Sequence, residues 1–244
     1  MLRKATAMIA AMALGGLMAT SIGSAGATAT TQSGACAGYE PVLDPANFVS
    51  VIDNPYYPLP VGRVLIYTGI KDGQTQKDTV TVTSQTKVIE GITATVITDV
   101  AKHGSALLEK TSDWYAQDNL GNVWYLGEDT KAYSPNGKID TSGSWEAGVN
   151  DAEPGIIMEA NPKVPDAYRQ ECLVGEAQDT GWIVDDTGTV TVPAGKFHNA
   201  LTSLEATQVE PGSYDQKIYA PGVGIVFEKA LTGDELAQLV SVTG

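Results

Sequence analysis

From Arg63 to the end of the chain, runs of β-favouring residues alternate with short clusters of turn residues. One of the longest runs, from Gln76 to Ile89, alternates valine with threonine and ends at Glu90-Gly91. Runs of this kind, bounded by Gly, Pro, Asn and Asp, are typical of strands joined by tight turns. Since no helical pattern separates them, we expect successive strands to form hairpins in an antiparallel sheet.

Antiparallel sheets with many strands usually curl or split into two layers. The sequence therefore predicts an all-β fold, with a single curved antiparallel sheet that is half-barrel or barrel-like. A two-layer β-sandwich is the alternative. We expect one antiparallel β domain over residues 41–244, in which a long loop at residues 130–165 crosses the mouth of the sheet. Loops this long in a compact domain are often functional, so a site is expected there.

The clearest predicted hairpin lies between Asp113 and Asp129. Two aromatic-rich runs flank the turn residues Asn119-Leu120-Gly121-Asn122. Short β-favouring runs separated by Gly and Asn predict a hairpin. Because side chains alternate across a strand, each face of this hairpin carries a large aromatic ring with a polar tip. Such a hairpin suits a sheet that packs on one side and lines a groove or a second layer on the other.

The first 27 residues have the pattern of a secretory signal peptide. Arg3 and Lys4 precede an apolar run, and Ala25-Gly26-Ala27 matches the small residues of a cleavage site. The mature protein is therefore expected to be secreted or extracytoplasmic, with a flexible leader at residues 28–40. The apolar run is shorter than the roughly 20 residues of a spanning helix, and no later run is longer, so no membrane span is predicted.

The chain has two cysteines, Cys36 and Cys172. Two cysteines in an exported chain usually pair, so a Cys36–Cys172 disulfide is predicted. The sequence Ser33-Gly34-Ala35-Cys36 is similar to a lipoprotein box, which makes lipidation of Cys36 the alternative. This alternative is weaker, because the cysteine lies well past the apolar run and lacks a leucine three positions before it.

The chain is strongly acidic. Its formal net charge is −14, and loss of Arg3 and Lys4 with the signal peptide takes it to −16. An acidic surface repels nucleic acid and anionic lipid and keeps a protein in solution. We therefore expect no nucleic-acid partner, and we expect the mature protein to be a monomer.

Four phrases carry a resemblance to a known family: Asn54-Pro55-Tyr56-Tyr57-Pro58-Leu59, the hairpin phrase from Asp113 to Tyr125, Ser144-Trp145-Glu146-Ala147-Gly148, and Tyr219-Ala220-Pro221-Gly222-Val223-Gly224. Through them nearly the whole mature chain resembles a large, uncharacterised family of exported bacterial β-rich proteins. More loosely, the strand order and the hairpin at residues 190–197 resemble half-barrel proteins of the lipoprotein-carrier kind. That second resemblance implies a concave face that holds an apolar ligand.

Acids and aromatic residues are concentrated between Asp113 and Glu176, where twelve Asp or Glu accompany four Lys or Arg and three of the four tryptophans. Glycoside chemistry uses aromatic rings beside two carboxyl groups, one of which donates a proton while the other attacks or activates water. If the protein is an enzyme, the candidate catalytic residues are Glu128, Glu146 and Glu171. The candidate ligand-binding residues are Trp114, Trp124, Tyr125, Trp145, Tyr168 and Arg169. The alternative is that these acids form a solvated face and the tryptophans belong to the core.

Arg169 is the only arginine after Arg63. If it faces a groove, its guanidinium group can bind a ligand carboxylate through two hydrogen bonds. The alternative is an ion pair between Arg169 and a neighbouring acid.

No cofactor and no metal site are predicted. His103 and His198 are far apart in the sequence and lack the spacing of a zinc motif. Calcium binding stays open, because the protein is acidic, although the turn at Asp118–Asn122 lacks the repeated acids of an EF-hand loop. The chain has no Gly-rich phosphate loop between a strand and a helix, and no G-x-S-x-G nucleophile motif.

Three functions remain open at this point. The first is a secreted binding protein for a small apolar or amphiphilic ligand held in a groove of the sheet. The second is a carbohydrate-active hydrolase or lyase that uses paired carboxylates. The third is a cell-surface protein interaction module, because Tyr and Trp are the usual anchors of protein interfaces. The expected partner is therefore a small-molecule or glycan ligand, unless the third function applies.

Overall fold

The structure is a computed structural model that describes residues 36, 38–71 and 73–244. The predicted signal peptide and most of the predicted leader lie outside these residues. The elements are η1 (Pro45–Asn47), β1 (Phe48–Val49), β2 (Val64–Lys71), β3 (Gln74–Ile89), β4 (Ile92–His103), β5 (Ala106–Asp118), β6 (Val123–Tyr133), β7 (Ile139–Asp140), β8 (Trp145–Glu146), β9 (Glu153–Met158), β10 (Ala167–Arg169), β11 (Glu171–Cys172), β12 (Asp179–Val192), β13 (Gly195–Thr207), β14 (Tyr214–Ala220), β15 (Gly224–Ala230) and β16 (Leu236–Thr243).

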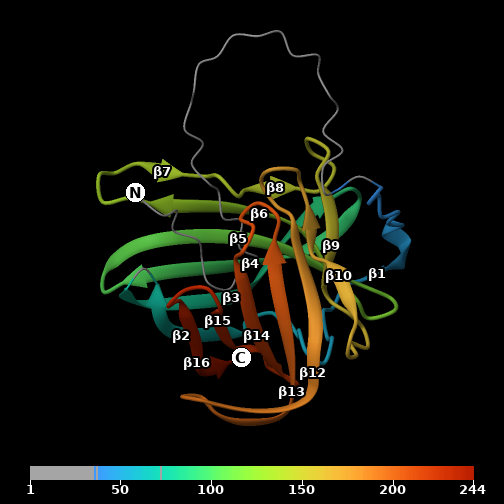
Figure 1. Ribbon diagram of the computed structural model, residues 1–244. Coiled ribbons are helices and arrows are strands. Elements are labelled where there is room, and N and C mark those ends of the chain that lie inside the picture. Colours follow the sequence, from blue (N-terminus) through green and yellow to red (C-terminus); the bar gives the residue numbers. More distant parts are fainter. Residues whose placement is uncertain (1–35, 37, 72) are drawn as a thin grey trace.

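All the strands belong to one antiparallel sheet. Its main order is β10-β12-β13-β14-β15-β16-β2-β3-β4-β5-β6-β9-β11, and β1, β7 and β8 pair with strands of this path. The pairing of β16 with β2 joins the C-terminal strands to the N-terminal ones. In Figure 1, β3 to β6 run across the view while β12 and β13 cross steeply in front of them, so the sheet curves round on itself.

The two ends of the sheet come back together. The terminal strands β10 and β11 are separated only by Gln170, whose backbone N–H donates to the carbonyl oxygen of Asp179 at 2.9 Å. The sheet is therefore nearly closed and barrel-shaped, which confirms the predicted fold class.

Residues 130–165, expected as a long loop, carry three short strands. Each of them, β7, β8 and β9, pairs with the edge of β6 that β5 leaves free. An unpaired edge presents unsatisfied backbone groups, and the returning chain covers it. Strands β7 and β8 have two residues each, too few for a period that can be recognised in a sequence, and β9 contains Pro154 and Gly155, which are turn signals. For these reasons the segment resembles a loop.

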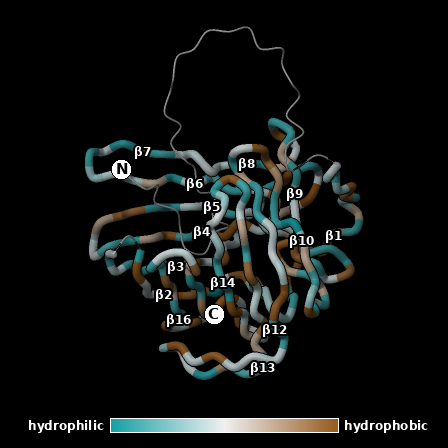
Figure 2. Tube along the Cα trace, in the orientation of Figure 1, coloured by the Kyte–Doolittle hydropathy of each residue, from teal (hydrophilic) through white to brown (hydrophobic). Residues whose placement is uncertain are grey.

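Side chains alternate between the interior and the outside of the curved sheet. In β3, Asp78, Val80 and Val82 are buried, while the threonines between them are half-buried. Figure 2 shows this alternation as colours that change repeatedly along the chain within the sheet. The largest fully buried hydrophobic side chains are Tyr67, Tyr125, Tyr219, Ile89, Ile92, Leu126, Met158, Ile183, Leu201 and Leu239.

The proline-rich segment before β2 packs against the sheet. Backbone N–H groups of Asp53 and Asn54 donate to the side-chain oxygen of Gln117 in β5, both at 2.9 Å. On the other side, the N–H of Gly222 donates to the carbonyl oxygen of Pro55 at 2.8 Å. The ring of Tyr57 is thereby held in the hydrophobic core.

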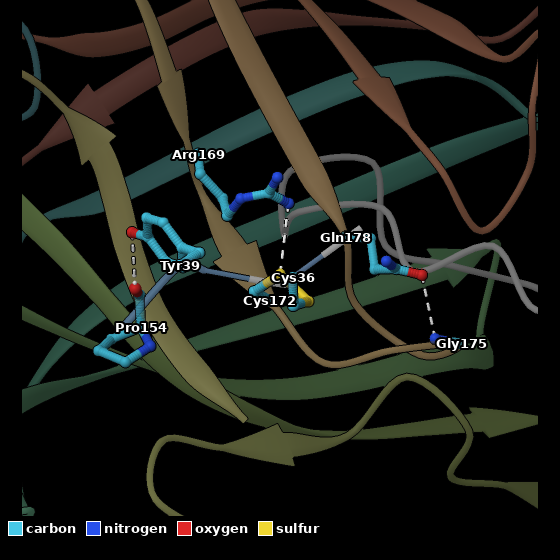
Figure 3. Close-up of a disulfide and its surroundings, with 7 residues drawn as sticks. All are labelled: Cys36, Tyr39, Pro154, Arg169, Cys172, Gly175 and Gln178. Atoms are coloured by element: carbon cyan, nitrogen blue, oxygen red, sulfur yellow. Dashed lines mark hydrogen bonds between the residues drawn. A yellow bond between two sulfur atoms is a disulfide. The ribbon is translucent and has the colours of Figure 1, made fainter. Parts of the chain in front are cut away.

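The predicted disulfide between Cys36 and Cys172 is present, with 5.7 Å between the two Cα atoms. Figure 3 shows that it ties the N-terminal part of the described chain to β11. Close by, the hydroxyl of Tyr39 donates to the carbonyl oxygen of Pro154 at 3.0 Å. Within the described residues, no helix is long and apolar enough to cross a membrane.

Candidate functional site

Ten carboxyl side chains are buried in the interior of the curved sheet, where a globular protein normally has hydrophobic ones. Each residue is less than 10% exposed. They are Asp78, Asp99, Glu109, Asp113, Glu128, Glu171, Asp179, Glu205, Asp215 and Glu228, and we call them the acidic region. Asp, Glu, Lys and Arg are rarely buried without a partner, so a region of this kind needs a specific explanation.

The strand register brings these carboxyls together from both sides of the sheet. Asp113 on β5 stands opposite Glu128 on β6, and Glu205 on β13 stands opposite Asp215 on β14. Electrostatic effects also act between strands that are not neighbours. The negative charge of Glu228 on β15, for example, acts on Asp99 of β4. The carboxyls therefore share one interior space.

On the β12–β15 side of the acidic region, a buried lysine compensates part of the negative charge. The Nζ atom of Lys217 lies 2.6 Å from Oε2 of Glu205, and both side chains are almost fully buried. Oε1 of Glu205 accepts from the Ser203 and Tyr219 hydroxyls at 3.1 and 3.2 Å. Burial alone would lower the pKa of Lys217, but the negative charges around it, Glu205 first, raise it above its ordinary value.

On the β3–β6 side of the acidic region, less of the negative charge is compensated by positive groups. Lys71 on β2 acts on Asp78 at its edge. The largest charges that act on Asp99 are those of Asp78, Asp113, Glu109 and Glu228, and neither of its carboxylate oxygens has a hydrogen-bond partner. Asp113 accepts a hydrogen bond from the Tyr125 hydroxyl at 2.9 Å. This side of the interior therefore holds several acids around Asp99, with Lys71 only at its edge.

Burial is the main cause of pKa shifts in the acidic region. It raises the pKa of Asp78 and Asp215 to about 6 and that of Asp113 and Asp179 to about 7. Taking a carboxylate out of water disfavours its charged form, and nearby negative charges act in the same direction. Part of the region is therefore protonated near neutral pH.

Four further carboxyls have a pKa well above the ordinary range, again chiefly because of burial. These are Asp99, Glu128, Glu171 and Glu228. For Glu171, the charge of Asp179 raises the pKa further. The indole of Trp145 has the opposite effect on Glu171, because it favours the charged carboxylate.

A small cavity opens within the acidic region, between Asp179, Glu205, Thr207, Asp215 and Lys217. Its volume of about 10 Å³ is on the order of the room that one water molecule needs. Two carboxylate oxygens around it, Oδ1 of Asp179 and Oδ1 of Asp215, have no hydrogen-bond partner. The cavity is polar enough to hold water or an ammonium-sized group.

A cluster of aromatic rings lies beside the acidic region. The rings of Tyr115 and Tyr125 stack with 4.8 Å between centroids, and Tyr57 meets Tyr115 edge-on at 5.4 Å. Tyr219 lies 6.4 Å from Tyr57, and Trp145 meets Tyr125 edge-on at 5.2 Å. We call these five residues the aromatic cluster. Its link to the acidic region is the hydrogen bond from Tyr125 to Asp113.

Five of the sequence-predicted site residues lie in the interior. Glu128 and Glu171 belong to the acidic region, and the charge of Glu171 acts on Glu128. Tyr125 and Trp145 belong to the aromatic cluster. Tyr168 is buried as well, and the charges of Glu205 and Lys217 act on its hydroxyl.

Two of the predicted residues, Glu146 and Trp114, lie on the face of the sheet away from Asp113 and Glu128, where Trp114 is buried in a hydrophobic cluster and Glu146 is half-buried. A half-exposed Lys87 joins them, with its Nζ 2.7 Å from Oε2 of Glu146 and 3.3 Å from the centre of the Trp114 ring. Gly127 allows this arrangement, because a Cβ atom there would lie 3.1 Å from the Trp114 ring and would clash with the Trp145 carbonyl. Glu146 is thus separated from Glu128 and Glu171.

The remaining two, Trp124 and Arg169, hold structural elements in place. The indole N–H of Trp124 donates to Oδ2 of Asp118 at 3.0 Å and supports the β5–β6 turn. Figure 3 shows Arg169 beside the disulfide, where one guanidinium N–H donates to Sγ of Cys172 at 3.3 Å. The Arg169 guanidinium carbon also lies 5.2 Å from the centre of the Tyr39 ring.

Sequence reasoning missed most of the acidic region. It did not single out Asp78, Asp99, Glu109, Asp113, Asp179, Glu205, Asp215, Lys217 or Glu228. The available signal was the two-residue period, for instance Asp215, Lys217 and Tyr219 on one face of β14. This signal is weak, because the opposite faces of these strands also carry polar residues.

The acids of the interior do not converge on a single point. Within residues 36, 38–71 and 73–244, no group of three or more His, Cys, Asp or Glu side chains is arranged so that it could hold a metal ion. The negative charge is instead spread along the strands.

Comparison with models of known protein families gives no match, and comparison with curated proteins gives none either. Among solved structures, a "putative lipoprotein" from Parabacteroides distasonis has a similar backbone, with a TM-score of 0.42 and 13% sequence identity. The match covers 78% of this chain and 99% of that chain. A TM-score this low carries no information on function. The family resemblance based on sequence motifs gains no support from these comparisons.

Proposed function

We propose that this protein is an extracytoplasmic binding protein, which holds a small amphiphilic molecule in the interior of its curved sheet. The observation that carries the proposal is the set of buried carboxylate oxygens without hydrogen-bond partners. Both oxygens of Asp99 and both of Glu228 are in this state, although these residues are only 1% and 2% exposed.

A buried polar group without a partner costs about 1–3 kcal/mol, and a buried charge costs more. A fold that serves only as a scaffold avoids such groups, because aliphatic residues fill an interior without this cost. Sites that violate the rules of stable packing are usually functional. Unpartnered acids in the interior are therefore what a binding site looks like before its ligand arrives.

The proposed ligand is amphiphilic because the interior has two kinds of lining. The aromatic cluster and aliphatic neighbours such as Leu201 and Leu239 suit an apolar body. The acidic region suits a polar head group. A purely apolar ligand would leave the buried carboxyls unpartnered, and so it fits this interior less well.

An extracytoplasmic location is supported by the Cys36–Cys172 disulfide, since such bonds persist in oxidising compartments. The signal-peptide pattern in the sequence is in agreement with this location.

The carbohydrate-active alternative has less support. It needs two carboxyls beside an open cleft. Glu128 and Glu171 are 4% and 0% exposed, and Glu146 lies on the other face of the sheet in an ion pair with Lys87. No polysaccharide chain reaches Glu128 or Glu171 in this arrangement.

Native mass spectrometry of the mature protein, purified from its own host, tests the proposal. The expected result is a complex heavier than the bare chain, which releases one small molecule on gentle denaturation. The matched control is the same protein unfolded and refolded without added ligand, which should have the bare mass. A bare mass in the host-purified sample, together with no binding in a ligand screen, would contradict the proposal.

A further inference from the structure

We infer that the ligand is a small organic cation, whose ammonium group binds among Asp99, Asp113 and Glu128 on the β3–β6 side of the acidic region. This inference rests on the proposed function and adds the charge of the head group to it.

The two sides of the acidic region provide the first argument. On the β12–β15 side, the ammonium group of Lys217 lies 2.6 Å from Glu205 and among Asp215 and Glu228. The β3–β6 side has a similar density of acids, but the largest charges that act on Asp99 all come from acids, and Lys71 acts only at the edge, on Asp78. Lys217 shows that this interior stabilises a primary ammonium group. The same group is what the β3–β6 side lacks.

The direction of the side chains provides the second argument. Asp99 is 1% exposed, has no hydrogen-bond partner on either oxygen, and senses acids on β3, β5 and β15. Strand β15 is not a neighbour of β4 in the sheet. The carboxylate of Asp99 therefore points into the shared interior and is free to accept hydrogen bonds from a bound donor.

The surroundings favour an organic cation over a metal ion. Metal ions need several oxygen ligands at one point, and the described residues offer no such group. An organic ammonium makes separate hydrogen bonds to carboxylates that stand apart. Aromatic rings also attract such cations, and Tyr115 and Tyr125 stack directly beside Asp113.

The size of the interior restricts the ligand to a small one. The cavity in the acidic region has room on the order of one water molecule. That cavity lies beside Lys217 on the β12–β15 side, where the protein's own ammonium group already occupies the acidic region. We therefore use short-chain probes.

The test compares three probes of equal chain length and different charge: n-butylamine, 1-butanol and butyrate. Thermal unfolding and isothermal titration calorimetry of the mature protein are recorded at pH 8, where the amine is protonated, with NaCl to match the ionic strength. At about 100 times its Kd, the amine is expected to raise the Tm by about 5 °C or more. Butanol and butyrate are expected to have little effect.

Two variants locate the binding. Asp99→Asn keeps the shape of the side chain and removes its charge, and it is expected to weaken amine binding at least about tenfold. Asp186→Asn removes a carboxyl from an exposed position on β12 and should bind like the wild type. Calorimetry on the folded variants gives their Kd values directly.

Each outcome decides between the two proposals. Tight binding of butanol or butyrate, weakened by interior substitutions, would keep the binding function and overturn the cationic ligand. Amine binding that Asp99→Asn and Asp186→Asn weaken equally would also overturn the inference, because the amine would then bind the acidic surface. If none of the probes binds and the host-purified protein is bare, both the inference and the proposed function fail.

Discussion

The aromatic cluster and the acidic region lie side by side in one interior, yet they follow opposite rules. The aromatic cluster is packed as an ordinary core is, with rings such as Tyr57 and Tyr115 buried in contact with one another. In the acidic region, carboxyls such as Asp99 are buried with no partner at all. The first region stabilises the fold, and the second lowers its stability, which is the cost that the proposed binding function accounts for.

The same strands build both regions, so the difference comes from single residues. On β5, Asp113 belongs to the acidic region and Tyr115, two positions on, to the aromatic cluster. Asp113 faces Glu128 of β6, and Tyr115 faces Tyr125. The pairing register of β5 with β6 shifts between these two pairs. Regular pleating would already place residues two apart on one face, and the shift adjusts how each meets its partner.

The largest effect is expected from removing the one buried cation on the β12–β15 side. Lys217→Met leaves Glu205 as an uncompensated buried carboxylate and should lower the free energy of unfolding by about 3–5 kcal/mol. Urea denaturation at pH 7 measures this. The double variant Lys217→Met/Glu205→Gln should recover part of the loss. A loss below about 1 kcal/mol in the single variant would mean that the interior is wet enough to screen these charges.

The pH dependence of stability should also be large. In the folded state, the pKa of Asp78 rises from its ordinary value of 3.8 to about 6, and that of Asp113 to about 7. The folded protein therefore holds protons that the unfolded chain releases above about pH 4, so stability must fall as pH rises. One carboxyl shifted like Asp78 contributes a loss of about 3 kcal/mol between pH 4 and pH 8.

Urea denaturation across this pH range, without amine buffers, measures the effect. Stability that stays flat or rises between pH 5 and pH 8 would contradict the account of the acidic region.

In the aromatic cluster, lost volume should matter and lost polarity should not. Tyr57→Ala removes a ring that contacts both Tyr115 and Tyr219, and it should cost about 3 kcal/mol. Tyr57→Phe keeps the ring and is the matched control, with an expected cost below about 1 kcal/mol. If both variants cost the same, the hydroxyl and not the packing is what matters at this position.

In the acidic region, a substitution is expected to raise the free energy of unfolding and not to lower it. Asp99→Asn removes a carboxyl whose pKa is raised by burial, and it should stabilise the ligand-free protein by about 1–2 kcal/mol at pH 8, because ionisation of this carboxyl there favours the unfolded wild type. At pH 4 the gain should shrink, because the unfolded chain then keeps much of its own Asp99 protonated. A destabilisation of the ligand-free protein at pH 8 would show that Asp99 has a structural partner.

The smallest effect is expected on the face of the sheet away from Asp113 and Glu128. The ion pair between Lys87 and Glu146 is about one-third exposed, and the lysine also covers the Trp114 ring. Lys87→Ala should therefore cost only about 0.5–1 kcal/mol. Both pairs join a lysine to a glutamate, so the difference between this loss and that of Lys217→Met measures how much more an ion pair contributes to stability when it is buried.

The features that local residues determine could be predicted from the sequence. Turn residues such as Glu90-Gly91 mark the ends of strands, and the aromatic runs around Gly121 predict the β5–β6 hairpin. The Cys36–Cys172 bond followed from the count of two cysteines. The two-residue strands β7 and β8 could not be predicted, because only the free edge of β6 makes them strands.

The acidic region could not be predicted, because burial there depends on the curvature of the whole sheet. On β3, Asp78 is buried while its neighbour Lys77 is exposed, and nothing local distinguishes the two polar positions. Of the predicted acids, Glu128 and Glu171 lie in the interior and Glu146 does not. The concentration of acids in the sequence indicated a site, but only the register of the strands assigns each acid to one face of the sheet.

The most direct test of the acidic region is the titration of its carboxyl groups by NMR. In protein with ¹³C-labelled Asp carboxyls and no amine present, Asp78, Asp113, Asp179 and Asp215 should titrate near pH 6 to 7. Added n-butylamine should lower the pKa of Asp113, because a bound ammonium favours its charged form. If every Asp carboxyl titrates near pH 4 in the free protein, the interior is not the poorly compensated acidic site described here.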